Sequence, residues 1–173
     1  TPNGKKELND NHLLIREIYL KYANDLWKNK DYYTSSSFFI RSNDIQKHIQ
    51  LFHEWYKLGN PIEKPYFITR IILQYLYVNN NENAQLFLDS VSPRDDMRGP
   101  SFRHPLINFC DLMIKALNLK SIKLYNMLFM HYMELLKYDE QLMILTKKIG
   151  YIQLGIPIKK EKGLLGNLMS MFG

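Results

Sequence analysis

Helical periodicity runs through nearly the whole chain. In successive segments, apolar residues recur at steps of three and four with polar residues between them, which is the pattern of amphipathic α-helices. No segment shows the sustained alternation of apolar and polar residues that is typical of a half-buried β-strand. With 173 residues, the chain is long enough to bury a sizeable core. The sequence therefore predicts an all-α protein.

The expected helices recur in pairs. They begin near residues 11, 31, 44, 63, 81, 103, 120 and 139. Consecutive pairs thus repeat about every 33 to 39 residues, which is the period of stacked helical hairpins. Residues around the first turn resemble the packing pattern of tetratricopeptide-type hairpins, although the full consensus is not met; they are Ala23, Leu26, Trp27, Tyr32 and Ser35. We expect an irregular α-solenoid of stacked tetratricopeptide-like hairpins, with extended faces for binding.

The helix boundaries carry recognisable signals. Ser42-Asn43-Asp44 supplies N-cap residues, and Gly59-Asn60-Pro61 forbids continuation of the helix before it. The longest break is expected at residues 92–103, which contain two prolines and a glycine. The first helix is predicted to bury one stripe of side chains, namely Ile15, Ile18, Tyr19, Tyr22, Ala23, Leu26 and Trp27.

These signals divide the chain into three parts. Residues 1–10 are expected to form a flexible start, 11–154 the helical-repeat domain, and 155–173 an extended segment with a short docking helix. Gly155 and Pro157 must end the last repeat helix, and a short β-hairpin or extended segment is expected between 155 and 163. Because the chain does not begin with Met, we expect it to be a piece of a longer protein.

The end of the chain carries an apolar stripe at helical spacing. Its members are Leu164, Leu165, Leu168, Met169 and Phe172. A segment of this length cannot hold a helix alone, so it must dock on its own chain, on a partner or on a membrane surface. The lysines stop at Lys162, and the stripe therefore lacks the cationic side that an interfacial membrane anchor prefers.

Charge and composition exclude several classes of protein. No run approaches the roughly 18 apolar residues that a membrane-spanning helix needs, so stable membrane insertion is not expected. The single cysteine, Cys110, can form no internal disulfide, which favours a reducing, cytosolic setting. The net charge of +6 comes largely from dispersed lysines. Nucleic acid is therefore not the expected partner, although a membrane-surface or RNA-binding helical-repeat module remains the alternative function.

Groups able to carry chemistry do not converge in the sequence. His48 and His53 are five residues apart, whereas two zinc ligands on one helix face need a spacing of four. Cys110 lies among apolar residues, which predicts a buried, inert thiol. Asp95-Asp96 falls in the proline-containing break and is typical of a solvated turn. No phosphate-binding glycine loop is present. We expect no catalytic site, metal or cofactor, and hence no enzyme.

Four ordered blocks resemble one known family. They are His12-Leu13-Leu14 with residues 23–28, Tyr33 and 35–39; then Ile72-Leu73-Gln74-Tyr75-Leu76; then residues 99–109; and finally Ile149-Gly150-Tyr151-Ile152-Gln153-Leu154-Gly155-Ile156-Pro157 followed by Gly163-Leu164-Leu165-Gly166-Asn167-Leu168. In this order they resemble the family of the fourth subunit of the guided-entry-of-tail-anchored-proteins pathway. The likeness covers nearly the whole chain but only the C-terminal part of the family protein.

The resemblance implies a cytosolic scaffold in the targeting of tail-anchored proteins to the endoplasmic reticulum. The C-terminal helices would hold the ubiquitin-like subunit of the pathway or, in animals, a BAG-type scaffold protein. Docking of the targeting ATPase is implied for N-terminal helices that would precede Thr1, so it is not placed on these residues. The match of the tail to the family's closing motif favours self-docking of the tail as a latch.

The predicted partner-binding residues continue apolar character past the last helix. They are Ile149, Tyr151, Ile152, Leu154, Ile156, Pro157 and Ile158. An extended segment here would offer an edge and apolar side chains to a partner. The same residues could instead cap the open end of the solenoid, which terminal repeats require, and the two roles are compatible.

Overall fold

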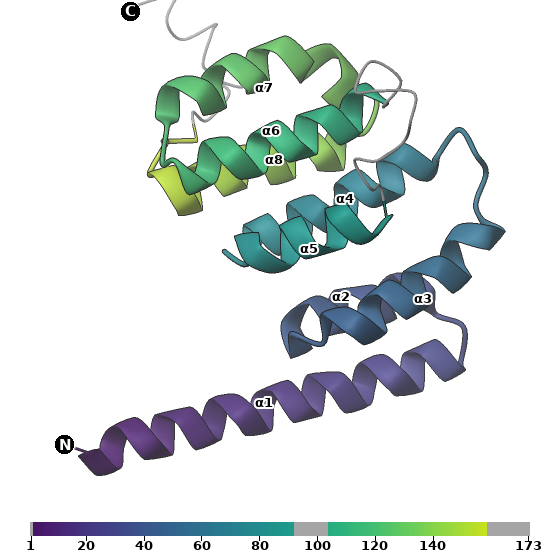
Figure 1. The fold of residues 1–173 in the computed structure, drawn as a ribbon, viewed down its shortest axis with the longest axis vertical. Coiled ribbons are helices and arrows are strands. Elements are labelled where there is room, and N and C mark those ends of the chain that lie inside the picture. Colours follow the sequence, from purple (N-terminus) through teal and green to yellow (C-terminus); the bar gives the residue numbers. More distant parts are fainter. Residues whose placement is uncertain (1, 92–103, 159–173) are drawn as a thin grey trace, which may run out of the picture.

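The computed structural model describes residues 2–91 and 104–158, and every regular element in these two stretches is an α-helix (Figure 1). The helices are α1 (Pro2–Lys28), α2 (Tyr32–Ser42), α3 (Ile45–Leu58), α4 (Lys64–Tyr77), α5 (Asn81–Val91), α6 (Pro105–Asn118), α7 (Ile122–Leu136) and α8 (Glu140–Leu154). The all-α prediction is thus confirmed. The break expected at 92–103 and the segment after Ile158 lie outside the described residues.

The first helix starts earlier than the sequence pattern indicated. It begins at Pro2 rather than near residue 11, so the residues expected to precede the first helix belong to it. The physical reason lies in residue type, because proline is favoured in a first turn and Lys5, Lys6, Glu7 and Leu8 all favour helix.

Of the seven residues in the predicted apolar stripe of α1, one is buried, three are half-buried and three are exposed. Ala23 is fully buried, whereas Ile15, Ile18 and Tyr22 are 47%, 46% and 56% exposed. The reason is a mismatch in length: α1 has 27 residues and its neighbour α2 has 11. At about 1.5 Å per residue, α2 can cover less than half of α1. Figure 1 shows the N-terminal part of α1 extending past the rest of the molecule.

Four tight turns between helices share one geometry in the described part of the chain. In each, a residue with positive φ is followed at once by the N-cap of the next helix. The positive φ reverses the chain within one residue, and the cap side chain accepts a hydrogen bond from an otherwise unpaired backbone N–H. The pairs are Lys30 and Asp31, Asn43 and Asp44, Asn79 and Asn80, and Lys120 and Ser121.

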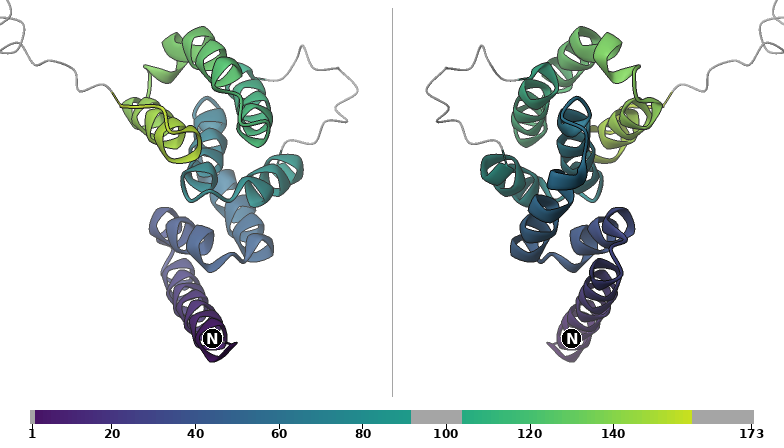
Figure 2. Two further views of the ribbon diagram at one scale, coloured as in Figure 1. Left: turned by 90° about the vertical axis from the view of Figure 1, so that its left-hand side faces the viewer. Right: turned by 90° about the vertical axis from the view of Figure 1, so that its right-hand side faces the viewer.

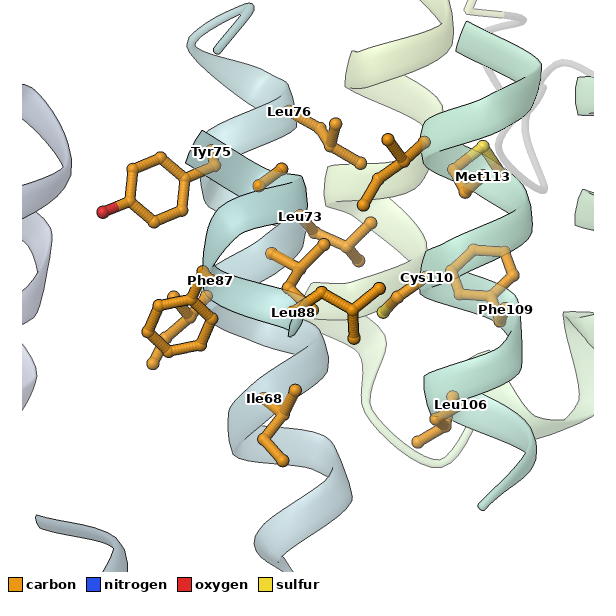
Figure 3. Close-up of a cluster of buried hydrophobic side chains, with 14 of the residues drawn as sticks. Ile68, Leu73, Tyr75, Leu76, Phe87, Leu88, Leu106, Phe109, Cys110 and Met113 are labelled. Carbon is orange, nitrogen blue, oxygen red and sulfur yellow. The ribbon is translucent and has the colours of Figure 1, made fainter. Parts of the chain in front are cut away.

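The main core forms around α4, which contacts α2, α5, α6 and α8. In Figure 3, Leu73 and Leu76 of α4 lie with Leu88 of α5 against Cys110 and Met113 of α6. The contact between α4 and α8 departs from a regular stack, in which each hairpin touches only its neighbours. Helices α6, α7 and α8 therefore form one end of the molecule, with α8 folded back onto the middle (Figures 1 and 2).

A buried polar network joins three helices beside this core. The His48 side chain on α3 is 0% exposed. Its Nε2 lies 2.7 Å from Ser36 Oγ on α2, and its Nδ1 lies 2.6 Å from Tyr75 Oη on α4. Burial lowers the pKa of His48 to about 3, so the ring is neutral at physiological pH. A neutral imidazole has one donor and one acceptor, which matches two hydroxyl partners.

Candidate functional site

The last helix ends as the sequence predicted. Gly155 has a φ of +69°, and its N–H donates to Tyr151 O at 3.0 Å. The N–H of Ile156 donates back to Gly150 O at 3.1 Å, which closes a left-handed helix cap. Because this cap turns the chain away from the axis of α8, residues 155–158 run beside the end of the helix without regular secondary structure.

The structure divides the seven predicted partner-binding residues into two groups. Ile149 is fully buried, and Leu154 and Ile156 pack partly buried against the main core. Four side chains lie on the surface instead: Tyr151, Ile152, Pro157 and Ile158. Three of these are large apolar residues, namely Tyr151, Ile152 and Ile158, which are 58%, 46% and 47% exposed. We call the four exposed residues the C-terminal face.

One exposed residue near this face was missed by the sequence reasoning. Leu119 follows α6 and is 70% exposed. Asn81 Nδ2 donates to Asn118 Oδ1 at 2.9 Å and to Gln153 Oε1 at 3.0 Å, so the turn containing Leu119 lies beside the end of α8. The sequence offered one signal for its exposure, because this leucine lies outside the inward stripe of its helix and immediately before a turn.

A glycine sets the distance between α7 and α8. Gly150 lies against Tyr125, whose hydroxyl donates to Thr146 O at 2.7 Å. A Cβ atom on residue 150 would lie only 2.5 Å from Tyr125 Oη, closer than van der Waals contact allows. Tyr125 is 3% exposed and has little room to move. The close approach of α8 to Tyr125 of α7 therefore requires glycine at residue 150. This contact positions the last turn of α8.

Gln153 anchors the last turn of α8 to the centre of the molecule. Its Nε2 donates to Leu76 O at 2.6 Å and to Asn81 Oδ1 at 2.8 Å. The side chain is nearly buried, at 9% exposure. These bonds join the end of α8 to the end of α4 and the start of α5, so the C-terminal face stands on a rigid base.

Replacing Gln153 tests this anchor. We expect Gln153→Leu to lower the free energy of unfolding by about 1 to 2 kcal/mol, because Leu76 O and the Asn81 amide lose their partner while side-chain volume is kept. Urea unfolding followed by circular dichroism measures the change. Gln141→Leu on the exposed first turn of the same helix is the matched control, and an equal effect of both changes would contradict the anchoring role.

Among the described residues, Ser36, His48 and Tyr75 most resemble a catalytic arrangement, and all three side chains are buried. The Cys110 thiol is also buried, and burial raises its pKa to about 12. Within residues 2–91 and 104–158, no three His, Cys, Asp or Glu side chains gather as a metal site would require.

The predicted tail latch falls outside the part of the chain that the structure describes. Its five residues, Leu164, Leu165, Leu168, Met169 and Phe172, therefore remain a prediction. Among the described helices, none combines the length and apolar character needed to cross a bilayer.

Comparison with known proteins points to one family. A family model described as Golgi to ER traffic protein 4 matches residues 15–172. A Golgi to ER traffic protein 4 homolog from Oryzias latipes is 28% identical over 160 residues, and the Homo sapiens homolog is 26% identical over 151 residues. These alignments cover 89% and 84% of this chain but 50% and 46% of the relatives, so the chain spans about half their length.

The fold is also similar to a solved structure. The crystal structure of C. therm. Get4 matches with a TM-score of 0.75 at 19% sequence identity. The match covers 91% of this chain and 56% of that one. This match confirms the prediction of an α-solenoid. At 19% identity it supports a conclusion about the fold alone.

Proposed function

The chain belongs to the Golgi to ER traffic protein 4 family, and from this membership we propose that it acts as a non-enzymatic adaptor in the targeting of tail-anchored proteins to the endoplasmic reticulum. Its place of action is the cytosol. The adaptor works by position: holding one component raises that component's effective concentration for another. Docking of the targeting ATPase is not assigned to these residues.

The C-terminal face is the part that holds the partner in this proposal. The partner is the ubiquitin-like subunit of the pathway or a BAG-type scaffold protein. The single observation that carries the assignment is the exposure of Tyr151, Ile152 and Ile158 on a helix end fixed by Gly150 and Gln153. Large apolar side chains presented on a rigid base are typical anchors of protein interfaces.

A binding measurement tests the C-terminal face. We expect the N-terminal segment of the ubiquitin-like subunit to bind the wild-type chain, and Ile152→Asp to weaken that binding roughly tenfold or more, because a charge would enter an apolar contact. Isothermal titration calorimetry gives the dissociation constants. Leu58→Asp on α3 is the matched control, since Leu58 is 70% exposed and lies on a different helix.

The result can overturn the proposal in two ways. A wild-type chain that is folded by circular dichroism but binds neither the ubiquitin-like subunit nor a BAG-type scaffold would contradict the assigned function. Equal affinity of the Ile152→Asp variant and the wild type would instead move the interface away from the C-terminal face.

A further inference from the structure

A groove crosses the face formed by α1, α2, α4 and α8. It consists of two hollows of about 420 and 390 Å³ that share Ile40, Arg41 and Val78, so they are parts of one depression. Lys148 of α8 lines one hollow and Arg16 of α1 lines the other. The groove therefore runs from α8 toward the long first helix.

Among the described side chains, the charges that line this groove all have one sign. They belong to Arg16, Arg41, Arg70 and Lys148, and no aspartate or glutamate within residues 11–91 and 104–158 lines either hollow. Arg70 is ion-paired with Asp139, the N-cap of α8. The other three cations have no acidic partner among the described residues. Such an array favours an anionic occupant.

The guanidinium of Arg70 has donor capacity left over. One of its terminal nitrogens pairs with Asp139, while its Nε is buried with no hydrogen-bond acceptor among the described residues. An unpaired buried donor costs free energy, which an acceptor brought by a ligand or by water would recover. Arg70 thus adds positive charge to the middle of the groove.

The walls between the cations carry large apolar side chains among polar ones. Tyr33 of α2, Tyr77 of α4 and Ile144 of α8 line the larger hollow and are 55%, 37% and 36% exposed. A free phosphate or other small anion would leave these side chains uncovered. An occupant that matches both features must carry carboxylates and apolar side chains in alternation along its length.

We propose that this groove binds an acidic, amphipathic segment of a partner protein. Carboxylates of the segment pair with Arg41, Lys148 and Arg16, while its apolar side chains pack on Tyr33, Tyr77 and Ile144. The chain's own C-terminal tail does not suit the groove, because it begins with Lys159, Lys160 and Lys162 and carries a single acidic residue, Glu161. The groove is a second docking site, and its α8 end at Lys148 lies one helical turn before Ile152 of the C-terminal face.

A peptide selection tests the groove and does not require the partner to be identified. The probe is a phage-displayed library of random peptides of about 12 residues, selected on the wild-type chain. We expect the enriched peptides to be acidic and to contain large apolar residues, and their affinity, measured by fluorescence anisotropy, to fall as salt rises. Replacing each peptide carboxylate by the matching amide should weaken binding roughly tenfold.

Two double variants locate the binding. Arg41→Glu with Lys148→Glu reverses two charges on the groove and should weaken peptide binding roughly tenfold or more. Lys21→Glu with Lys123→Glu makes the same change in net charge on exposed positions that line neither hollow, and should leave binding within about twofold. Thermal unfolding of both variants establishes that each is folded.

Each remaining outcome overturns the inference. Enriched peptides that are neutral or basic would contradict an acidic occupant. Equal weakening by both double variants would show that the net charge of the protein, and not the groove, causes the loss of affinity. Peptides that bind the groove variant as well as the wild type, but lose affinity for Ile152→Asp, would assign the acidic segment to the C-terminal face instead. If anionic vesicles or RNA bind the groove more tightly than the peptides do, its ligand is a membrane or a nucleic acid and not a protein segment.

Discussion

Lowering the pH from about 6.5 to about 4 should cost this protein roughly 3 kcal/mol of stability through His48 alone. The fully buried imidazole has its pKa lowered to about 3, whereas the unfolded chain has a histidine of ordinary pKa near 6.5. Between these values the unfolded state binds a proton that the folded state does not. The free energy of unfolding is therefore unaffected by His48 above about pH 6.5, and below it decreases by about 1.4 kcal/mol for each pH unit.

The variant His48→Gln isolates this effect. Glutamine can still exchange hydrogen bonds with Ser36 and Tyr75, but it does not titrate. The free energy of unfolding of the variant should therefore vary less with pH than that of the wild type, by the contribution of one bound proton. Urea unfolding at several pH values gives both curves. His104, whose pKa is also lowered by burial, is present in both proteins and cancels in the difference. Parallel curves for wild type and variant would show that His48 is accessible to protons in the folded state.

The second large effect is expected at Gly150. Gly150→Ala should lower the free energy of unfolding by about 2 to 3 kcal/mol, because the new Cβ would lie 2.5 Å from Tyr125 Oη and 2.6 Å from Tyr125 Cζ. This loss outweighs the roughly 1 kcal/mol that alanine gains over glycine within a helix. The displaced ring would also break its hydrogen bond to Thr146 O.

Two comparisons identify steric overlap as the cause. Gly155→Ala, five residues further on, meets no atom within 4 Å and is limited only by its positive φ, so it should cost about 1 kcal/mol. In a Tyr125→Ala background the clash is absent, and Gly150→Ala should then be neutral or stabilising. Equal costs of Gly150→Ala in both backgrounds would rule out the contact with Tyr125 as their origin.

The two glycines also show what a single sequence reveals. Gly155, with Pro157 two residues later, is a local stop signal, and the helix ends there as predicted. Gly150 sits inside a helix, where residue type alone predicts only a small loss of stability. Its role depends on Tyr125, which is on another helix, and no local pattern records that contact.

The same distinction applies to the candidate site. The apolar character of residues 149–158 could be recognised in the sequence, and the structure places Tyr151, Ile152 and Ile158 on the surface. The sequence did not separate these from Ile149, which is fully buried in the core. Their separation follows from α8 folding back onto α4, a contact between helices more than sixty residues apart.

The sequence by itself determined the helices and the turns between them, because periodicity, N-caps and positive-φ residues act over three to five neighbouring positions. The tertiary structure alone decided which apolar faces are covered. It left three of the seven residues of the α1 stripe exposed, enclosed His48 between hydroxyl groups, and brought Arg41, Arg70 and Lys148 from three helices to one groove. These outcomes depend on helix lengths and on contacts between distant segments, and such contacts are settled by packing around a shared core rather than by any local pattern.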